Sequence, residues 1–301
     1  MRYGLMIETG GTVAEVTDRV RAVADAGIPA AGMSQIFGYD ALTVLAVAGS
    51  QVPDVELVTG VVPTYPRHPF MLAAQALTVQ AATGGRLTLG IGLSHKLVVE
   101  GMWGLSFDRP LRHMREYLEV LLPLLRGEAV NFEGETIQAR VGLEIDAPAP
   151  DVLVAALGPK MLELTGRVAD GTMTWMTGAK TIEAHTMPDI TAAAEAAGRR
   201  APRVAVSLPV SVTADVDAAR AQANDTFAIY GTLPSYRAML DREGAAGPGD
   251  VAIVGDEDSV AAQLGHFADI GATDFIVAPF GSRDDQARTK ALVADLARTG
   301  A

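Results

Sequence analysis

Apolar positions along the chain fall into two kinds of run, and the two kinds alternate. The first is short and rich in β-branched residues, as in Val55–Val62, which is typical of a strand buried on both faces. The second is longer and repeats its apolar residues at helical spacing, as Val13, Val16 and Val20 do. This alternation is the pattern of repeated βα units. The predicted strands cover Arg2–Glu8, Ala30–Gln35, Val55–Val62, Arg86–Ile91, Val152–Ala156, Gly171–Trp175, Arg203–Val212 and Thr273–Val277. After the helix that begins at Val13, further helices are expected over Asp40–Gln51, Phe70–Thr83, Arg109–Arg126, Pro159–Val168, Lys180–Ala197, Ala214–Tyr230, Ser259–Ile270 and Asp284–Arg298.

The number of βα units favours one fold class. Eight predicted strands with helices between them fit a closed (β/α)8 TIM barrel better than an open doubly wound sheet, which remains the alternative. We expect residues 1–301 to form a single barrel domain, because the sequence contains no linker, charge block or low-complexity segment. Irregular stretches predict insertions after the fourth and the seventh strand, at Gly92–Asp108, Gly127–Pro150 and Gly231–Asp250.

Composition narrows the classes of partner. The chain carries 36 acidic and 24 basic side chains, a net charge of -12, which argues against a nucleic-acid or anionic-membrane binder. A small anionic ligand remains open, because backbone amides bind phosphate without a net positive charge. The absence of cysteine excludes disulfides, thiolate nucleophiles and cysteine-ligated metals. Neither a membrane-spanning apolar run nor a signal-peptide core is visible, so we expect a cytoplasmic protein.

Candidate chemistry in a barrel belongs to the loops that follow the strands. Two of these loops resemble anion sites, because Leu157-Gly158-Pro159-Lys160 and Met176-Thr177-Gly178-Ala179-Lys180 each join a strand to a helix start. The alternative is that Gly158 and Gly178 only make tight turns, and the spacing weighs both equally. The Rossmann and P-loop glycine motifs are absent from the strand ends.

Two further loops could face a ligand. In Thr59-Gly60-Val61-Val62-Pro63, the glycine near the end of a strand marks either a bulge that a planar ring can approach or simple barrel curvature. In Gly90-Ile91-Gly92-Leu93-Ser94-His95-Lys96, Ser94 can bond a ring or substrate and His95 can exchange a proton, although a lone loop histidine is more often structural.

Metal binding is not supported by the remaining histidines. His68, His95, His113, His185 and His266 form no pair at helical spacing, so we expect no metal site. His113 and His266 lie in predicted helices and are expected to be packed or solvated. His68 is expected to cap or pack at the helix that follows it, and His185 has no evident partner.

Several motifs together carry a family resemblance. Thr59–Pro63 is followed by Arg67-His68-Pro69, and Gly85-Arg86-Leu87-Thr88-Leu89-Gly90-Ile91-Gly92 follows the next helix. Further matches are Arg115-Glu116-Tyr117-Leu118 and Ala155-Ala156-Leu157-Gly158-Pro159. Over almost its whole length the chain resembles the bacterial luciferase-like flavin and deazaflavin oxidoreductases. Gly90–His95 and Leu233–Arg242 look like an actinobacterial subgroup that uses the deazaflavin coenzyme F420.

The resemblance implies a set of cofactor contacts at the carboxyl ends of the strands. A non-proline cis peptide would fall at Gly60–Val61 and support the deazaflavin ring. The phosphate and ribityl chain would contact the loops at Gly158 and Gly178. The cofactor-binding residues implied or proposed are Ser34, Gln35, Thr59, Gly60, Val61, Ser94, His95, Leu157, Gly158, Pro159, Lys160, Thr177 and Gly178. A homodimer is also expected from the resemblance.

Two departures from the family pattern bear on the substrate. Relatives that oxidise sugar phosphates or alcohols carry an acid and a histidine after the second strand, where this chain has Ser34-Gln35-Ile36-Phe37. The position that is often acidic after the fourth strand is His95. Both departures favour hydride delivery to an activated C=C, C=N or C=O bond of a small substrate, with His95 as proton donor or substrate orienter.

Other functions stay open at this point. An FMN-dependent monooxygenase is the alternative within the same family. A non-catalytic F420-binding or storage protein is the alternative outside enzymes, because the acid–base pair is missing. A phosphate-sugar isomerase on the same barrel lacks the expected base.

Overall fold

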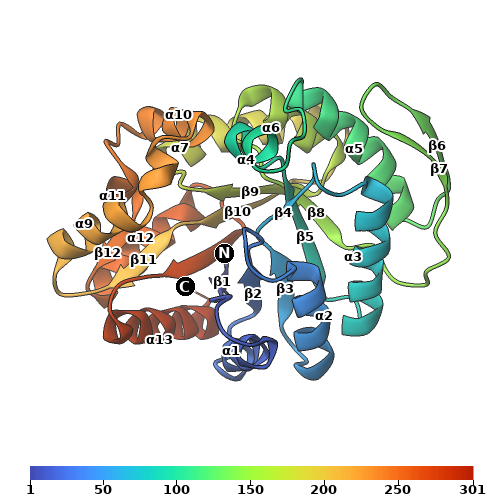
Figure 1. Ribbon diagram of the computed structural model, residues 1–301. Coiled ribbons are helices and arrows are strands. Elements are labelled where there is room, and N and C mark those ends of the chain that lie inside the picture. Colours follow the sequence, from blue (N-terminus) through green and yellow to red (C-terminus); the bar gives the residue numbers. More distant parts are fainter. Residues whose placement is uncertain (301) are drawn as a thin grey trace. The chain divides into compact units, whose positions relative to one another are not determined.

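Parallel strands alternate with helices from one end of the chain to the other (Figure 1), as the hydrophobic pattern predicts. The computed structural model describes residues 1–300, which divide into two units. Unit 1 consists of Met1–Ile7, Ala22–Gly32 and the chain from Ala156 onward, and unit 2 consists of Glu8–Arg21 and Met33–Ala155. The prediction of a single domain stays a prediction.

Unit 1 contains a ladder of parallel strands in the order β2, β1, β13, β10, β9. A short extension adds β11, which pairs with both β13 and β12. Their bounds are β1 (Arg2–Met6), β2 (Ala30–Met33), β9 (Gly171–Trp175), β10 (Arg203–Ser207), β11 (Pro209–Val212), β12 (Ile253–Gly255) and β13 (Asp274–Pro279). The strands β10 and β11 divide one predicted strand, because Pro209 has no amide to continue the first ladder.

Unit 2 is built on β5, which pairs with β3 and β4 on one side and with β8 on the other. The bounds are β3 (Glu56–Thr59), β4 (Val62–Pro63), β5 (Leu87–Gly92) and β8 (Asp151–Val154). Between α5 (Pro110–Leu125) and β8 the chain also forms an antiparallel hairpin of β6 (Val130–Glu133) and β7 (Gln138–Val141).

The strand order identifies the fold class. Among the described residues, the sheet runs β1-β2-β3-β5-β8-β9-β10-β13, and β13 pairs again with β1. A parallel sheet that closes on itself in this order, with helices between its strands, is a (β/α)8 TIM barrel. The predicted fold class is confirmed. The three predicted insertions are irregular as expected: Gly92–Asp108 contains the short helix α4 (Lys96–Gly101), Gly127–Pro150 contains the β6–β7 hairpin, and Gly231–Asp250 contains α10 (Pro234–Glu243).

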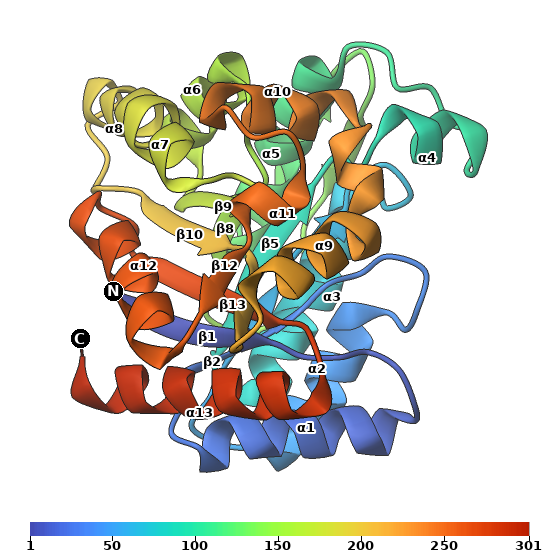
Figure 2. The same ribbon diagram turned by 90° about the vertical axis from the view of Figure 1, so that its left-hand side faces the viewer.

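Helices follow the strands and begin at residues that suit helix starts. Asp40 accepts a hydrogen bond from the amide of Thr43 at 2.8 Å, and Pro69 opens α3 after His68. The Nδ1 of His68 accepts from the amide of Phe70 at 3.3 Å, so the predicted capping role is confirmed. In unit 2 and at its edge lie α1 (Val13–Asp25), α2 (Ala41–Gln51), α3 (Pro69–Thr83), α4 (Lys96–Gly101) and α5 (Pro110–Leu125). Unit 1 contains α6 (Pro159–Val168), α7 (Ala179–Thr181), α8 (Met187–Ala196), α9 (Val216–Thr226), α10 (Pro234–Glu243), α11 (Pro248–Val251), α12 (Glu257–Asp269) and α13 (Arg283–Thr299), which Figure 2 shows from the side.

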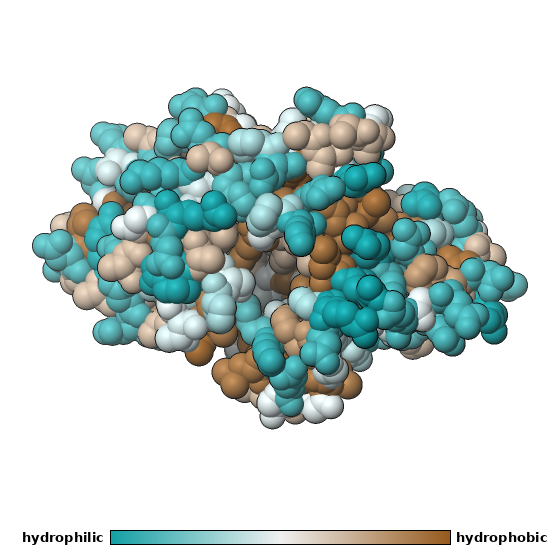
Figure 3. All heavy atoms as spheres, turned by 90° about the horizontal axis from the view of Figure 1, so that it is seen from above, coloured by the Kyte–Doolittle hydropathy of each residue, from teal (hydrophilic) through white to brown (hydrophobic). Residues whose placement is uncertain are grey.

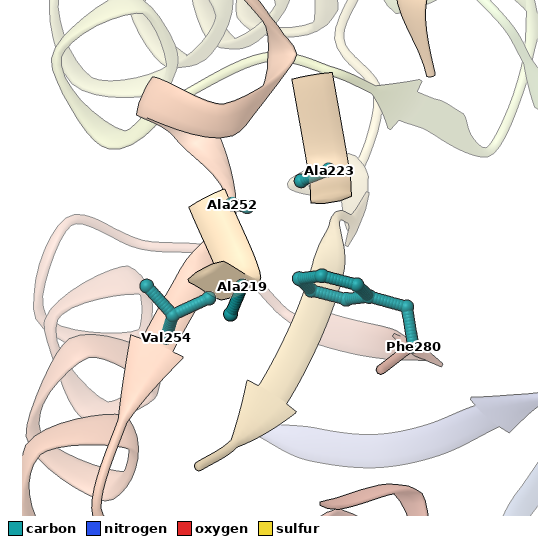
Figure 4. Close-up of a cluster of buried hydrophobic side chains, with 5 residues drawn as sticks. All are labelled: Ala219, Ala223, Ala252, Val254 and Phe280. Carbon is teal, nitrogen blue, oxygen red and sulfur yellow. The ribbon is translucent and has the colours of Figure 1, made fainter. Parts of the chain in front are cut away.

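In unit 1, α9, β12 and the residue after β13 share a small core (Figure 4). The ring of Phe280, just after β13, lies beside Ala219 and Ala223 of α9, and Val254 of β12 packs against the same cluster. Small residues on α9 let the helix approach the strands closely. The hydrophobic pattern does not predict β12, because a strand of 3 residues, Ile253–Gly255, is too short to show a period.

An ion cluster closes the amino ends of the unit 1 strands. Asp274, which is 2% exposed, accepts from Arg203 Nη2 at 3.0 Å and from Arg2 Nε at 2.9 Å. Within residues 1–300, helices long and apolar enough to cross a membrane are lacking, and so are clusters of metal-ligating side chains.

Candidate functional site

The predicted site residues lie in loops at the carboxyl ends of the strands. Unit 2 contributes the loops after β2, β3 and β5, and unit 1 contributes those after β8 and β9. Parallel strands present their carboxyl ends at one edge of a sheet, so the residues within each unit share that edge.

The turn between β3 and β4 is built against β5. The peptide Gly60–Val61 is cis, at the predicted position. The hydroxyl of Thr59 donates to the carbonyl of Gly90 at 2.8 Å and accepts from the amide of the same residue at 2.8 Å. The amide of Gly60 donates to the carbonyl of Met33 at 2.9 Å. These bonds tie the turn to both neighbouring strands of the predicted site.

Two glycines of β5 make room for this turn. A Cβ on Gly90 would lie 1.9 Å from the carbonyl oxygen of Thr59, and one on Gly92 would lie 2.7 Å from Cγ2 of Val61. Neither position therefore tolerates a side chain without a shift of the turn. The glycine spacing that carries the family resemblance has this local cause.

The loop after β2 forms one wall of a hollow in unit 2. The side chain of Gln35 accepts from the amide of Ala41 at 3.1 Å and thereby caps α2. Gln35 also borders a cavity of about 270 Å³ whose other walls are Ile36, Pro63, Pro66, Arg67 and Trp103. Ser34 precedes it and is half-buried. Gln35 and Arg67 bring polar side chains to this cavity, and the remaining lining side chains are apolar or aromatic.

Exposed apolar side chains gather on the same loops of unit 2. Ile36 is 60% and Phe37 is 70% exposed in the loop after β2, and Leu97 and Met102 are 59% and 58% exposed at α4. Figure 3 looks down on the face that carries α4 and shows brown surface among the polar side chains. Large apolar groups exposed together favour contact with an apolar ligand or partner.

His95 lies at the start of α4, directly after Ser94, whose φ is 62°. Burial lowers the pKa of the His95 ring below its ordinary value of 6.5. The ring is therefore mostly neutral at pH 7, with one nitrogen as donor and one as acceptor. This state suits a residue that orients a substrate by a hydrogen bond.

His113 lies in α5 behind the loop after β4. Its ring stacks on Tyr65 at 4.0 Å between centroids, and its Nε2 lies 3.1 Å from the hydroxyl of Thr64. Burial lowers the pKa of His113 to about 4, against a smaller opposing effect of Glu116. The prediction that His113 is packed is confirmed. Its neutral ring packs against the loop through Tyr65 and Thr64.

In unit 1 the start of α6 is open. Gly158 is the N-cap residue, its backbone is extended, and Pro159 takes the first helical position. Its two chain neighbours aside, a Cβ on Gly158 would have no atom of the described residues within 4 Å. Among these residues none accepts a hydrogen bond from the Gly158 amide, and Lys160 is exposed beside it. An anion could reach this helix start without displacing a side chain.

The start of α7 is different, because Glu243 of α10 already occupies it. Its carboxylate accepts from the amides of Lys180 at 3.2 Å and Thr181 at 3.0 Å. A Cβ on Gly178 would lie 2.4 Å from Cδ of Glu243, and the hydroxyl of Thr177 donates to the Trp175 carbonyl at 3.2 Å. The amides that the sequence offers to a phosphate are bound to a carboxylate of the chain. The predicted cofactor contacts of Thr177 and Gly178 stay predictions.

The contacts of two residues in this region, Glu243 and His185, are not predicted from the sequence. Glu243 lies far along the chain from the helix that it caps, and local patterns give no signal for such a pair. His185 contacts the carbonyl of Leu157 through Nε2 at 2.8 Å and Asp189 through Nδ1 at 3.1 Å. Only the helical spacing of His185 and Asp189 could have indicated that second contact.

Comparisons with known proteins cover most of the chain. The family model for luciferase-like monooxygenases matches residues 1–274. A 5,10-methylenetetrahydromethanopterin reductase of Methanolobus tindarius is 29% identical over 282 residues, which cover 83% of this chain and 84% of the reductase.

Solved structures agree in fold. A coenzyme F420-dependent tetrahydromethanopterin reductase from Methanopyrus kandleri superposes with a TM-score of 0.83, at 22% identity and 99% coverage of both chains. A type II Baeyer–Villiger monooxygenase from Pseudomonas putida, in complex with FMN, superposes with a TM-score of 0.77, at 18% identity and with 99% of this chain and 97% of the monooxygenase covered. At these identities the likeness is one of fold.

Proposed function

The chain belongs to the luciferase-like monooxygenase family, and from that membership we propose that it is a coenzyme F420-dependent oxidoreductase. It would transfer a hydride between the deazaflavin and a small organic substrate, in the direction that reduces an activated C=C, C=N or C=O bond. The observation that carries the proposal is the open start of α6 at Gly158, in a chain similar to a 5,10-methylenetetrahydromethanopterin reductase over 83% of its length. Two further relatives carry the cofactor in their names, an F420-dependent glucose-6-phosphate dehydrogenase of Nakamurella multipartita and a putative coenzyme F420-dependent oxidoreductase of Mycobacterium tuberculosis, and they support the cofactor rather than the substrate.

The residues present fit a phosphate-bearing cofactor in unit 1. The amide of Gly158 has no acceptor among the described residues, it lies at the positive end of the α6 dipole, and Lys160 adds a charge beside it. Leu157 and Pro159 would flank the phosphate. Such local binding is compatible with a net charge of -12, because amides rather than a basic surface supply the attraction.

In unit 2 the residues proposed for the ring are backbone and small polar groups. The Thr59-Gly60-Val61 turn is held on β5 and offers a surface with little side chain. Ser34, Gln35 and Ser94 would bond the polar edge of the ring or the substrate. When bound, the cofactor supplies a hydride from its ring carbon.

The substrate would lie against the apolar walls near Gln35 and Trp103. The acceptor carbon gains the hydride and its electron pair, and the neighbouring atom gains a proton. His95 would orient that atom by a hydrogen bond from its neutral ring, and the proton would then come from solvent. Because the loop after β2 carries Ser34 and Gln35 instead of an acid and a histidine, dehydrogenation of a sugar phosphate is disfavoured.

Cofactor choice is the first test. Purified protein titrated with F420, FMN and FAD, followed by fluorescence, should bind F420 most tightly and should then reduce candidate enones with reduced F420. Preference for FMN together with oxygen consumption would instead support a monooxygenase, since deazaflavins lack the nitrogen that forms oxygen adducts. Tight F420 binding without turnover of any acceptor would support a storage protein.

A substitution at the helix start tests the site itself. Gly158 has φ -87° and ψ 156°, a conformation open to aspartate. In Gly158→Asp the new carboxylate would cap α6, as Glu243 caps α7, and should weaken F420 binding at least tenfold. The control ligand is the deazaflavin with its ribityl chain but without the phosphate, called the riboside below. Affinity for this riboside should not change. Equal loss for both ligands would contradict the placement of the phosphate.

His95→Ala tests the orienting role. Turnover should fall much more than F420 affinity, while His266→Ala, at an exposed histidine of α12, serves as the control. With a neutral ring as the active form, kcat should be constant from pH 7 to 8 and should fall only when acid protonates the ring, whose pKa burial lowers. Unchanged turnover in His95→Ala would rule out the role. A homodimer stays part of the proposal, and light scattering on the eluting protein would test it.

A further inference from the structure

The helix after β9 is interrupted by a turn of π-helix. The segment α7, the π-turn Ile182–Thr186 and α8 follow one another without a break, where the sequence predicts one helix over Lys180–Ala197. Pro188 lies inside it, and a proline lacks the amide that would continue the regular ladder. The amide of Met187 instead donates to the carbonyl of Ile182, five residues back. The extra residue of such a turn changes the direction in which its side chains point.

His185 lies in this π-turn and points toward the loop after β8. Its side chain is only 8% exposed, and its Nε2 lies 2.8 Å from the carbonyl oxygen of Leu157. A carbonyl oxygen can only accept, so Nε2 carries the hydrogen. Asp189 contacts Nδ1 at 3.1 Å from the next turn of the same helix. A carboxylate only accepts, so this contact is a hydrogen bond when Nδ1 carries a proton as well. In that form of the ring, the carboxylate holds it in the orientation that bonds Leu157.

The contact with Leu157 bears on the neighbouring amide. The carbonyl of Leu157 and the N–H of Gly158 belong to one planar trans peptide, so they point in opposite directions. A bond that fixes the carbonyl therefore fixes the direction of the N–H. Donation to the carbonyl also makes the N–H of the same peptide a stronger donor. Gly158, with φ -87°, would otherwise be among the freest residues of the loop.

We propose that His185, held by Asp189, is a positioning residue that aims the Gly158 amide at the phosphate of the cofactor. The inference rests on the proposed function for the identity of that ligand, and on the geometry of the Leu157–Gly158 peptide for the role. The start of α6 is the helix start that needs such support, because Glu243 already satisfies the amides at the start of α7.

Two variants separate positioning from packing. His185→Phe keeps a ring but removes the donor, and His185→Gln keeps an N–H that can reach Leu157. Each variant is titrated with F420 and with its phosphate-free riboside, with His266→Phe as the exposed control. In His185→Phe the Kd for F420 should rise about tenfold, the change produced by one hydrogen bond of roughly 1.4 kcal/mol. The Kd for the riboside should stay within twofold, and His185→Gln should recover most of the F420 affinity.

Equal weakening of both ligands in His185→Phe would show a merely structural role and overturn the proposal, as would an unchanged Kd for F420. A second readout does not need F420. In protein labelled with ¹⁵N-glycine, inorganic phosphate should shift the Gly158 amide resonance, identified by its loss in Gly158→Ala, and His185→Phe should reduce that shift. If F420 does not bind but this shift appears and depends on His185, the proposed cofactor is wrong and the positioning role stands. Absence of the dependence overturns the role.

Discussion

Replacing the buried imidazole of His113 by a ring that does not titrate should change how the free energy of unfolding depends on pH. The ring is 8% exposed, and its pKa is lowered from 6.5 to about 4, chiefly by burial. The unfolded chain therefore binds a proton between pH 6.5 and 4 that the folded chain does not accept, and stability falls as the pH is lowered through this range. The stabilising effect of the neutral ring is complete above pH 6.5.

The size of the effect follows from the two pKa values. At pH 5, protonation of the ring in the unfolded state lowers the free energy of unfolding by about 2 kcal/mol relative to pH 8. His113→Phe removes this cost, since phenylalanine does not titrate. It also removes the bond to the buried hydroxyl of Thr64, which costs about 1 kcal/mol at every pH.

The two effects oppose each other and cross within an accessible range. At pH 8 the variant should be less stable than the native protein by about 1 kcal/mol, and near pH 5 it should be equal or more stable. Urea unfolding of both proteins at pH 8, 6.5 and 5 measures the difference, with unchanged m-values as the check that the unfolded states are comparable. His266→Phe, at an exposed histidine, is the control. A stability difference that is the same at pH 8 and pH 5 would refute the reasoning.

Three further substitutions test other parts of the structure. Asp274→Asn should destabilise the fold by about 3–5 kcal/mol, measured by urea unfolding, because it leaves Arg203 beside a buried neutral group; a change below 1 kcal/mol would contradict this. Glu116→Gln should cost about 2 kcal/mol and loosen the turn between β6 and β7, seen as faster amide exchange, because one oxygen that accepts from that turn is lost. Gly92→Ala should raise the Kd for F420 and for its riboside by the same factor, because the new Cβ would press on Val61, beside the proposed ring site. A Kd that rises only for F420 would argue against that placement.

The sequence by itself determined the fold class and the places where a ligand could bind. Periodicity is a local property, and it is enough to separate β-branched strands such as Gly171–Trp175 from amphipathic helices such as Pro159–Val168, both of which the structure reproduces residue for residue. Because chemistry in a barrel belongs to the loops after its strands, the same alternation also located the candidate loops.

Short elements were not predictable in this way. The helices α4 and α11 and the strand β12 are too brief to show a period, and tertiary contacts stabilise them. The break of the predicted strand Val55–Val62 into β3 and β4 depends on the turn at Gly60, whose bonds run to Met33 and Gly90 on neighbouring strands.

Only the tertiary structure decided which of the two candidate anion sites is open. In sequence the loops at Gly158 and Gly178 look alike, because each places a glycine between a strand and a helix. In the fold, Glu243 of α10 accepts hydrogen bonds from the amides that follow Gly178, whereas His185 of the π-turn contacts the Leu157 carbonyl next to Gly158. Both contacts join residues far apart in the chain, so no local pattern records them. The difference between the two loops is therefore a property of packing, although each glycine was visible in the sequence.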